Sequence, residues 1–101
     1  MFLIIIHSWS DFENAQESKD KANEAKSNGN FDEAISHFTK AMELGSVSAL
    51  ILANRGECLL KLKKPCAAIN DCTAAIELNP DSAKALRYIY VIIVNYRINI
   101  Y

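Results

Sequence analysis

The chain lacks an excess of charge of either sign. It has 11 basic and 12 acidic side chains among 101 residues, which leaves a net charge of −1. There is no overall field to attract nucleic acid or an anionic membrane, so neither is expected as a partner. The length allows one domain with a modest core, and no separate catalytic lobe.

Long hydrophobic runs are also missing. The apolar start, Met1–Ile6, has neither the basic region nor the apolar length of about 7 to 15 residues that a secretory signal requires. The apolar stretch Tyr88–Val94 is interrupted well short of the roughly 20 residues that span a bilayer. We therefore predict no exported precursor, no transmembrane helix and no membrane partner.

Cysteine is scarce and is not spaced for metal binding. The three cysteines contain no C-x-x-C pair, and both histidines, His7 and His37, lie far from them in sequence. No metal site is expected. We interpret Cys58 and Cys72 as small buried hydrophobic residues and place Cys66 near a helix start. This usage fits a reduced, cytoplasmic setting.

The sequence shows no catalytic constellation. Gly29, Gly45 and Gly56 are isolated, so no phosphate-binding loop is formed, and no nucleophile lies beside a base. We predict that the chain is not an enzyme and holds no cofactor. Phe31 and Phe38 lie on an apolar helical stripe, which favours a place in the core over base stacking.

The positive signal is an internal repeat. Identical residues recur 34 positions apart. The pairs are Ala34 and Ala68, Ile35 and Ile69, Thr39 and Thr73, Ala41 and Ala75, and Glu43-Leu44 and Glu77-Leu78. A period of about 34 residues is typical of two-helix units, which bury their apolar faces only by stacking on neighbours. The fold class predicted is therefore all-α, a short α-solenoid, which indicates binding rather than catalysis.

Apolar spacing and turn residues predict where each helix lies. The expected helices are about Asp11–Lys26, Phe31–Leu44, Ala49–Leu62, Pro65 to about Leu78, and one beginning near Ala83. Gly29 can adopt the left-handed conformation that ends a helix, and Asp81 or Ser82 can cap the last one. The predicted organisation is an N-terminal extension (1–14), two repeats (15–48 and 49–82) and a partial third (83–101).

The C-terminal segment departs from the repeat pattern. From Tyr88 to Val94 it is β-branched and aromatic without a polar face, which suits neither a capping helix nor a solvent-exposed one. Two interpretations stay open. The segment either packs as a crude cap, or forms a self-association surface that makes a homodimer.

Several segments carry a family resemblance. Gly29–Ile35, Asn54-Arg55, Lys61–Cys72 and Ala75–Lys84 resemble tetratricopeptide-repeat co-chaperones, and most of all the Hsc-interacting protein (Hip) family. The resemblance covers roughly residues 15–87. It implies a helix-turn-helix repeat fold and, as the partner, a heat-shock chaperone of the 70-kDa class. Contact with the nucleotide-binding domain of that chaperone is one implied mode.

The first helices of stacked repeats line a concave groove, where a partner peptide would lie. The side chains expected there are mostly basic or amide. They are Lys19, Asn23, Lys26, Asn54, Glu57, Lys61, Lys84 and Arg87.

The resemblance also implies a second mode, in which a carboxylate clamp captures an acidic chaperone tail. The matching positions are Lys19, Asn23, Asn54 and Lys84. The fifth member of the clamp should be an arginine where this chain has Tyr88. Arg87 is one residue early, about 100° away around a helix. A further alternative is a truncated fragment that folds only by self-association.

Overall fold

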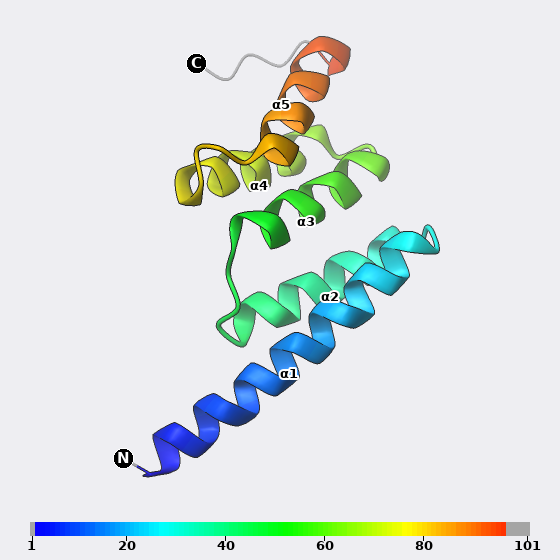
Figure 1. Ribbon diagram of the computed structural model, residues 1–101. Helices are drawn as coiled ribbons and strands as arrows, with labels where there is room; N and C mark the ends of the chain where they lie inside the picture. Colours follow the sequence, from blue (N-terminus) through cyan, green and yellow to red (C-terminus); the bar gives the residue numbers. More distant parts are fainter. Residues whose placement is uncertain (1, 97–101) are drawn as a thin grey trace. The chain divides into compact units, whose positions relative to one another are not determined.

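The chain folds into helices joined by short turns (Figure 1). The computed structural model describes the backbone of residues 2–96 and the side chains of residues 10–96. The helices are α1 (Phe2–Ser27), α2 (Phe31–Glu43), α3 (Ala49–Lys61), α4 (Pro65–Leu78) and α5 (Ala83–Tyr96). They form two units, Met1–Val47 with α1 and α2, and Ser48–Tyr101 with α3, α4 and α5, which are described separately below.

The predicted helices are confirmed, with one difference. The starts of α2, α3, α4 and α5 coincide with those expected from the sequence, and their ends agree to within a residue wherever an end was predicted. Helix α1 is longer than predicted, because it begins at Phe2 rather than near Asp11. No glycine or proline precedes Gly29, so nothing in the chain breaks the helix before that turn.

Local chemistry explains the turns. Gly29 has a φ of 80° and ends α1 in the left-handed region, as predicted. The Ser48 side chain accepts a hydrogen bond from the backbone N–H of Ile51 and caps α3. Pro65 occupies the first turn of α4, where its missing N–H costs nothing. Of the two predicted caps for α5, Ser82 accepts from the N–H of Ala85.

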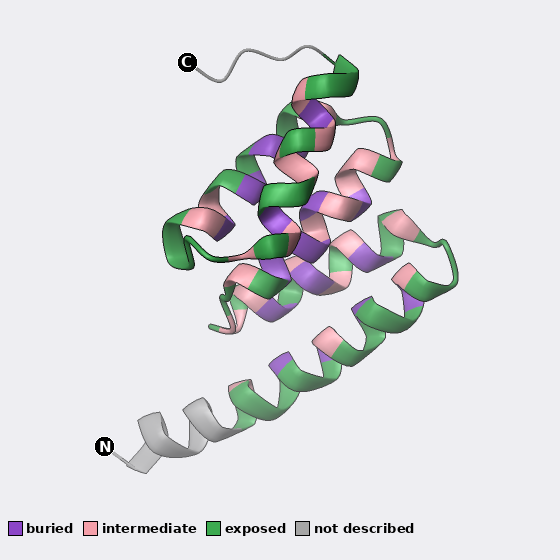
Figure 2. Cartoon of the chain, turned by 45° about the horizontal axis from the view of Figure 1, so that its top comes forward, coloured by how far each residue is buried: buried purple, intermediate pink, exposed green. Residues whose placement is uncertain are grey.

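In the first unit, α1 packs against α2 through small residues. The buried side chains on these helices include Ala15, Ser18, Ala22, Ala25, Ala34, Phe38 and Ala41. On α1 they recur every three or four residues, which makes one stripe (Figure 2). Alanines allow the two helix backbones to approach closely. Phe38 is buried, which confirms its predicted place in the core.

In the second unit, α5 lies against both α3 and α4. Ala68, Ile69 and Ile92 form a buried cluster. Leu59 and Leu60 of α3 and Ile89 and Ile93 of α5 pack around it. The orientation of α5 is therefore set by apolar contacts with both neighbouring helices.

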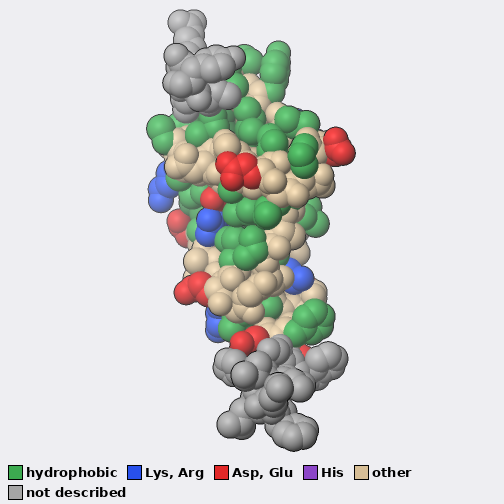
Figure 3. Space-filling view, turned by 90° about the vertical axis from the view of Figure 1, so that its left-hand side faces the viewer, with side chains coloured by type: hydrophobic (Ala, Val, Ile, Leu, Met, Phe, Trp, Pro, Cys, Tyr) green, Lys and Arg blue, Asp and Glu red, His purple; other side chains and the backbone are tan. Residues whose placement is uncertain are grey.

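The expectation that Tyr88–Val94 suits no capping helix is wrong. The segment is helical, and Ile92 is fully buried within the α3–α5 packing. Its β-branched residues favour strands only weakly, and tertiary burial outweighs that preference. Self-association remains a prediction. Leu86, Tyr90 and Val94 are exposed, and their spacing of four residues places them on one side of α5. Hydrophobic side chains are visible on the face shown in Figure 3.

Among residues 2–96, no helix combines the length and the apolar character needed to cross a bilayer.

Gly56 lies where α3 crosses α4, and an added methyl group there would collide with α4. A Cβ atom would lie 2.8 Å from Sγ of Cys72 and 3.3 Å from the carbonyl oxygen of Ala68. We expect Gly56→Ala to lower the free energy of unfolding by about 1–2 kcal/mol, since overpacking outweighs the gain in helix propensity. Chemical denaturation measures this change.

A second substitution provides the control. Cys72→Ala in the Gly56→Ala background removes the nearest atom and should recover part of the loss. An unchanged or increased stability of Gly56→Ala would contradict the close approach.

Candidate peptide-binding surface

The predicted binding residues lie in both units. Lys19, Asn23 and Lys26 are on α1 in the first unit. Asn54 and Lys61 are on α3, and Lys84 and Arg87 on α5, all in the second unit. Convergence of the two groups on one groove stays a prediction, and each group is described by itself below.

On α1 the three predicted residues share a face. Their spacing of four and three residues places them together on one side of the helix. Asn23 is exposed, while Lys19 and Lys26 are half-buried. Lys19 also lines a shallow hollow of about 430 Å³, beside Phe12 of α1 and the loop that follows α2. This face therefore offers ammonium and amide groups next to an apolar surface.

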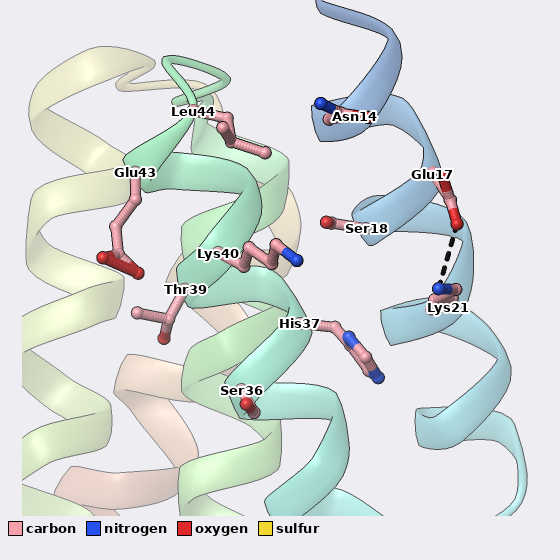
Figure 4. A pocket seen from close by; sticks show the side chains of 10 residues that line it. All are labelled: Asn14, Glu17, Ser18, Lys21, Ser36, His37, Thr39, Lys40, Glu43 and Leu44. Carbon is pink, nitrogen blue, oxygen red and sulfur yellow. Dashed lines mark ion pairs between the residues drawn. The ribbon is translucent and has the colours of Figure 1, made fainter. Parts of the chain in front are cut away.

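A larger hollow, of about 900 Å³, lies between α1 and α2 (Figure 4). Its lining residues are Asn14, Glu17, Ser18, Lys21, Ser36, His37, Thr39, Lys40, Glu43 and Leu44. Lys21 Nζ lies 2.9 Å from Oε1 of Glu17, and this neighbour lowers the pKa of the Glu17 carboxyl. At about 100° per residue, the α1 part of the hollow and the predicted binding face lie on opposite flanks of the buried stripe.

This hollow was not predicted from the sequence. Its lysines are accompanied by carboxylates, including that of Glu43, so its charge is mixed. The only sequence signal was the spacing of Glu17 and Lys21, which is typical of an exposed helical ion pair. We therefore give the hollow no part in the binding surface.

In the second unit, the structure brings two of the clamp residues into contact. The Lys84 ammonium group donates a hydrogen bond to Oδ1 of Asn54, joining α5 to α3. Asn54 is only 7% exposed, so protein atoms rather than water surround its side chain. Two side chains that were expected to bind a peptide carboxylate therefore contact each other, while their binding of a peptide stays a prediction.

Glu57 shares the same lysine. Its Oε1 lies 3.0 Å from Nζ of Lys84, one helical turn along α3 from Asn54. The side chains of Lys84 and Glu57 are 24% and 15% exposed, so water screens the pair only in part. The anion-binding end of the predicted clamp therefore already contains a carboxylate of this chain.

Tyr88 occupies the position where the resemblance implied an arginine. Burial, followed by a hydrogen bond to Glu57 and the charge of that carboxylate, raises the pKa of the Tyr88 hydroxyl. Arg87 is exposed, with its guanidinium carbon 5.2 Å from the centre of the Tyr88 ring. Lys61 is exposed in the last turn of α3.

An ion pair fixes the helix that carries Asn54. Arg55 Nε donates to Oδ2 of Asp71 at 2.6 Å, and Nη2 donates to Oδ1 at 2.8 Å, which ties α3 to α4. The hydrogen bond to Asp71 raises the pKa of the Arg55 guanidinium. Both residues lie in segments that carry the family resemblance, but no ion pair between them was predicted.

The cysteines have the predicted placement. Cys58 and Cys72 are buried, Cys66 is exposed, and all three are free thiols. Burial and, secondarily, the charge of Asp71 raise the pKa of the Cys72 thiol to about 11, so it is protonated at neutral pH. Within residues 10–96, no group of three or more His, Cys, Asp or Glu side chains is arranged to hold a metal ion.

Two curated proteins illustrate the sequence relationship. The chain is 51% identical over 75 residues to the TPR repeat-containing thioredoxin TDX of Arabidopsis thaliana, and this match spans 74% of the chain and 20% of that protein. It is 46% identical over 78 residues to Hsc70-interacting protein 1 of Drosophila melanogaster, a match that spans 77% of the chain and 21% of that protein. The chain thus spans about a fifth of the length of these relatives.

A solved structure and a family model agree on the fold. The second TPR of Spaghetti (RPAP3), bound to the HSP90 peptide SRMEEVD, matches with a TM-score of 0.82 and 28% identity, over 92% of this chain and 80% of that one. The tetratricopeptide repeat model matches residues 20–44 and 49–82, more than half of the sequence. From its repeated helical hairpins and this match, we conclude that the chain belongs to the tetratricopeptide repeat family.

Proposed function

We propose that this chain is a chaperone-binding adaptor that captures the acidic C-terminal tail of a heat-shock chaperone. The observation that carries the proposal is the contact of Lys84 with Asn54, in which two residues of the predicted clamp meet on adjoining helices. The similar RPAP3 structure holds an HSP90 peptide that ends in two glutamates, a valine and an aspartate.

The chemistry of the surface suits such a tail. A terminal carboxylate next to an aspartate side chain offers several hydrogen-bond acceptors. Ammonium and amide groups held on helices can donate charge-assisted hydrogen bonds to them at a small cost in side-chain entropy. We assign this role to Asn54 and Lys84, with Lys19 and Asn23 as the first-unit members of the clamp and Lys26, Lys61 and Arg87 as peripheral contacts.

The proposed partner is a chaperone of the 70-kDa class. Identity of 46% to Hsc70-interacting protein 1 favours a 70-kDa partner, and the three free thiols favour a reducing, cytoplasmic setting. The same identity supports a second candidate, in which the chain contacts the nucleotide-binding domain of the chaperone instead of its tail.

Calorimetric titration distinguishes these two candidates. If the tail is captured, the peptide SRMEEVD binds with a Kd on the order of micromolar, and affinity falls as salt is added. If the second candidate holds, a chaperone without its tail binds and the peptide does not. Absence of peptide binding at low salt would eliminate tail capture.

A further inference from the structure

Glu57 has no role in the clamp that the sequence suggested. Its carboxylate lies 3.0 Å from the Lys84 ammonium group, which also donates to Asn54. Burial and then the same carboxylate raise the pKa of the Tyr88 hydroxyl, which places Tyr88 close to Glu57. The charge expected to receive a peptide carboxylate is thus paired with an internal carboxylate, on a part of the surface that is largely shielded from water.

We propose that Glu57 is a specificity-determining residue, an internal competitor that occupies Lys84 and must give way before a peptide carboxylate binds there. This inference rests on the proposed capture of acidic peptides. An incoming carboxylate either displaces Glu57 from the Lys84 ammonium group or binds that group together with Glu57. In the second case two negative charges lie next to each other. Both routes reduce the gain in free energy from binding an anion.

The surroundings of Glu57 strengthen this effect. At the position of Tyr88 an arginine would supply a second positive charge, whereas the phenol of Tyr88, close to Glu57, supplies none. The other basic residue of α5 is Arg87, whose guanidinium lies against the ring of Tyr88. The arrangement therefore selects tails that make strong contacts elsewhere and discriminates against those that rely on one carboxylate at Lys84.

The test is the substitution Glu57→Gln, which keeps the side-chain shape and removes the charge. Titration of SRMEEVD is expected to show binding about three to ten times tighter than with the unchanged chain, as for partly screened ion pairs. A control peptide without carboxylates, SRMQQVN with a C-terminal amide, should gain no affinity. Equal affinity of both proteins for SRMEEVD would overturn the inference and leave tail capture standing.

A matched control removes the same charge elsewhere. Glu77 is exposed on α4, so Glu77→Gln changes the net charge equally without touching Lys84. If Glu77→Gln tightens peptide binding as much as Glu57→Gln, the gain comes from the change in net charge, and Glu57 does not compete for Lys84. If the peptide binds to none of the three proteins, both tail capture and the role proposed for Glu57 are rejected.

A measurement without peptide tests the internal pair directly. A double-mutant cycle with Glu57→Gln, Lys84→Met and their combination reports the coupling between the two side chains during unfolding. The pair predicts a favourable coupling in the free protein. Strictly additive effects would mean that Glu57 does not hold Lys84, which overturns the inference whatever the peptide does.

Discussion

Asn54→Ala is expected to weaken binding of SRMEEVD by about 1–3 kcal/mol, the range for hydrogen bonds to charged groups. The substitution removes an amide that can donate to a carboxylate, and it also removes the Oδ1 atom to which Lys84 donates. Lys84 would then lose one of the contacts that direct its ammonium group. Isothermal titration calorimetry on both proteins measures the difference.

Two further variants define what the loss means. Asn70→Ala makes the same chemical change at an exposed position of α4 and should leave the affinity unchanged. Lys19→Ala, on α1, should weaken binding by a similar amount to Asn54→Ala if the two units act on one peptide. Full affinity in Asn54→Ala, with helicity intact by circular dichroism, would remove α3 from the binding surface.

Asp71→Ala is expected to lower the free energy of unfolding by about 3 kcal/mol. Its carboxylate receives two hydrogen bonds from Arg55, and the two side chains are 11% and 23% exposed. Removing one partner of a largely buried pair leaves the other charge without its counter-ion. Urea denaturation followed by circular dichroism measures the loss, and since the pair joins α3 to α4, peptide affinity should fall with it.

The pair itself can be replaced. Changing both Arg55 and Asp71 to methionine removes both charges of this pair, so most of the stability should return. Glu77→Ala removes an exposed carboxylate from the same helix and should change stability by less than about 0.5 kcal/mol. A loss no larger for Asp71→Ala than for Glu77→Ala would show that the ion pair contributes little.

The candidate site could be predicted only in part. The family resemblance, placed on the chain by the register of the repeat, selected Asn54 and Lys84, which the fold brings into contact. It gave no reason to pair Lys84 with Glu57, because that contact depends on how α5 lies against α3. It also gave no structural role to Arg55 and Asp71, which are 16 residues apart and meet only where their helices cross.

The sequence by itself determined the helices, their turns and the repeat. Apolar residues three and four apart select the buried side of a helix, and small residues such as Ala22, Ala34 and Ala68 mark where backbones come close. Gly29 and Pro65 act through the backbone alone, so their effects are legible without any knowledge of neighbours.

Only the tertiary structure decided which side of α5 is buried and which groups Lys84 contacts. The segment Tyr88–Val94 has apolar side chains on all sides of its helix, so no polar face within it indicates which side is buried. Packing on α3 and α4 selects Ile92. A lysine side chain can reach several partners, and the choice depends on which carboxylates and amides the fold places nearby. The spacing of apolar residues reflects the geometry of a single helix. Pairing of charges between helices depends on distances that exist only after the chain has folded.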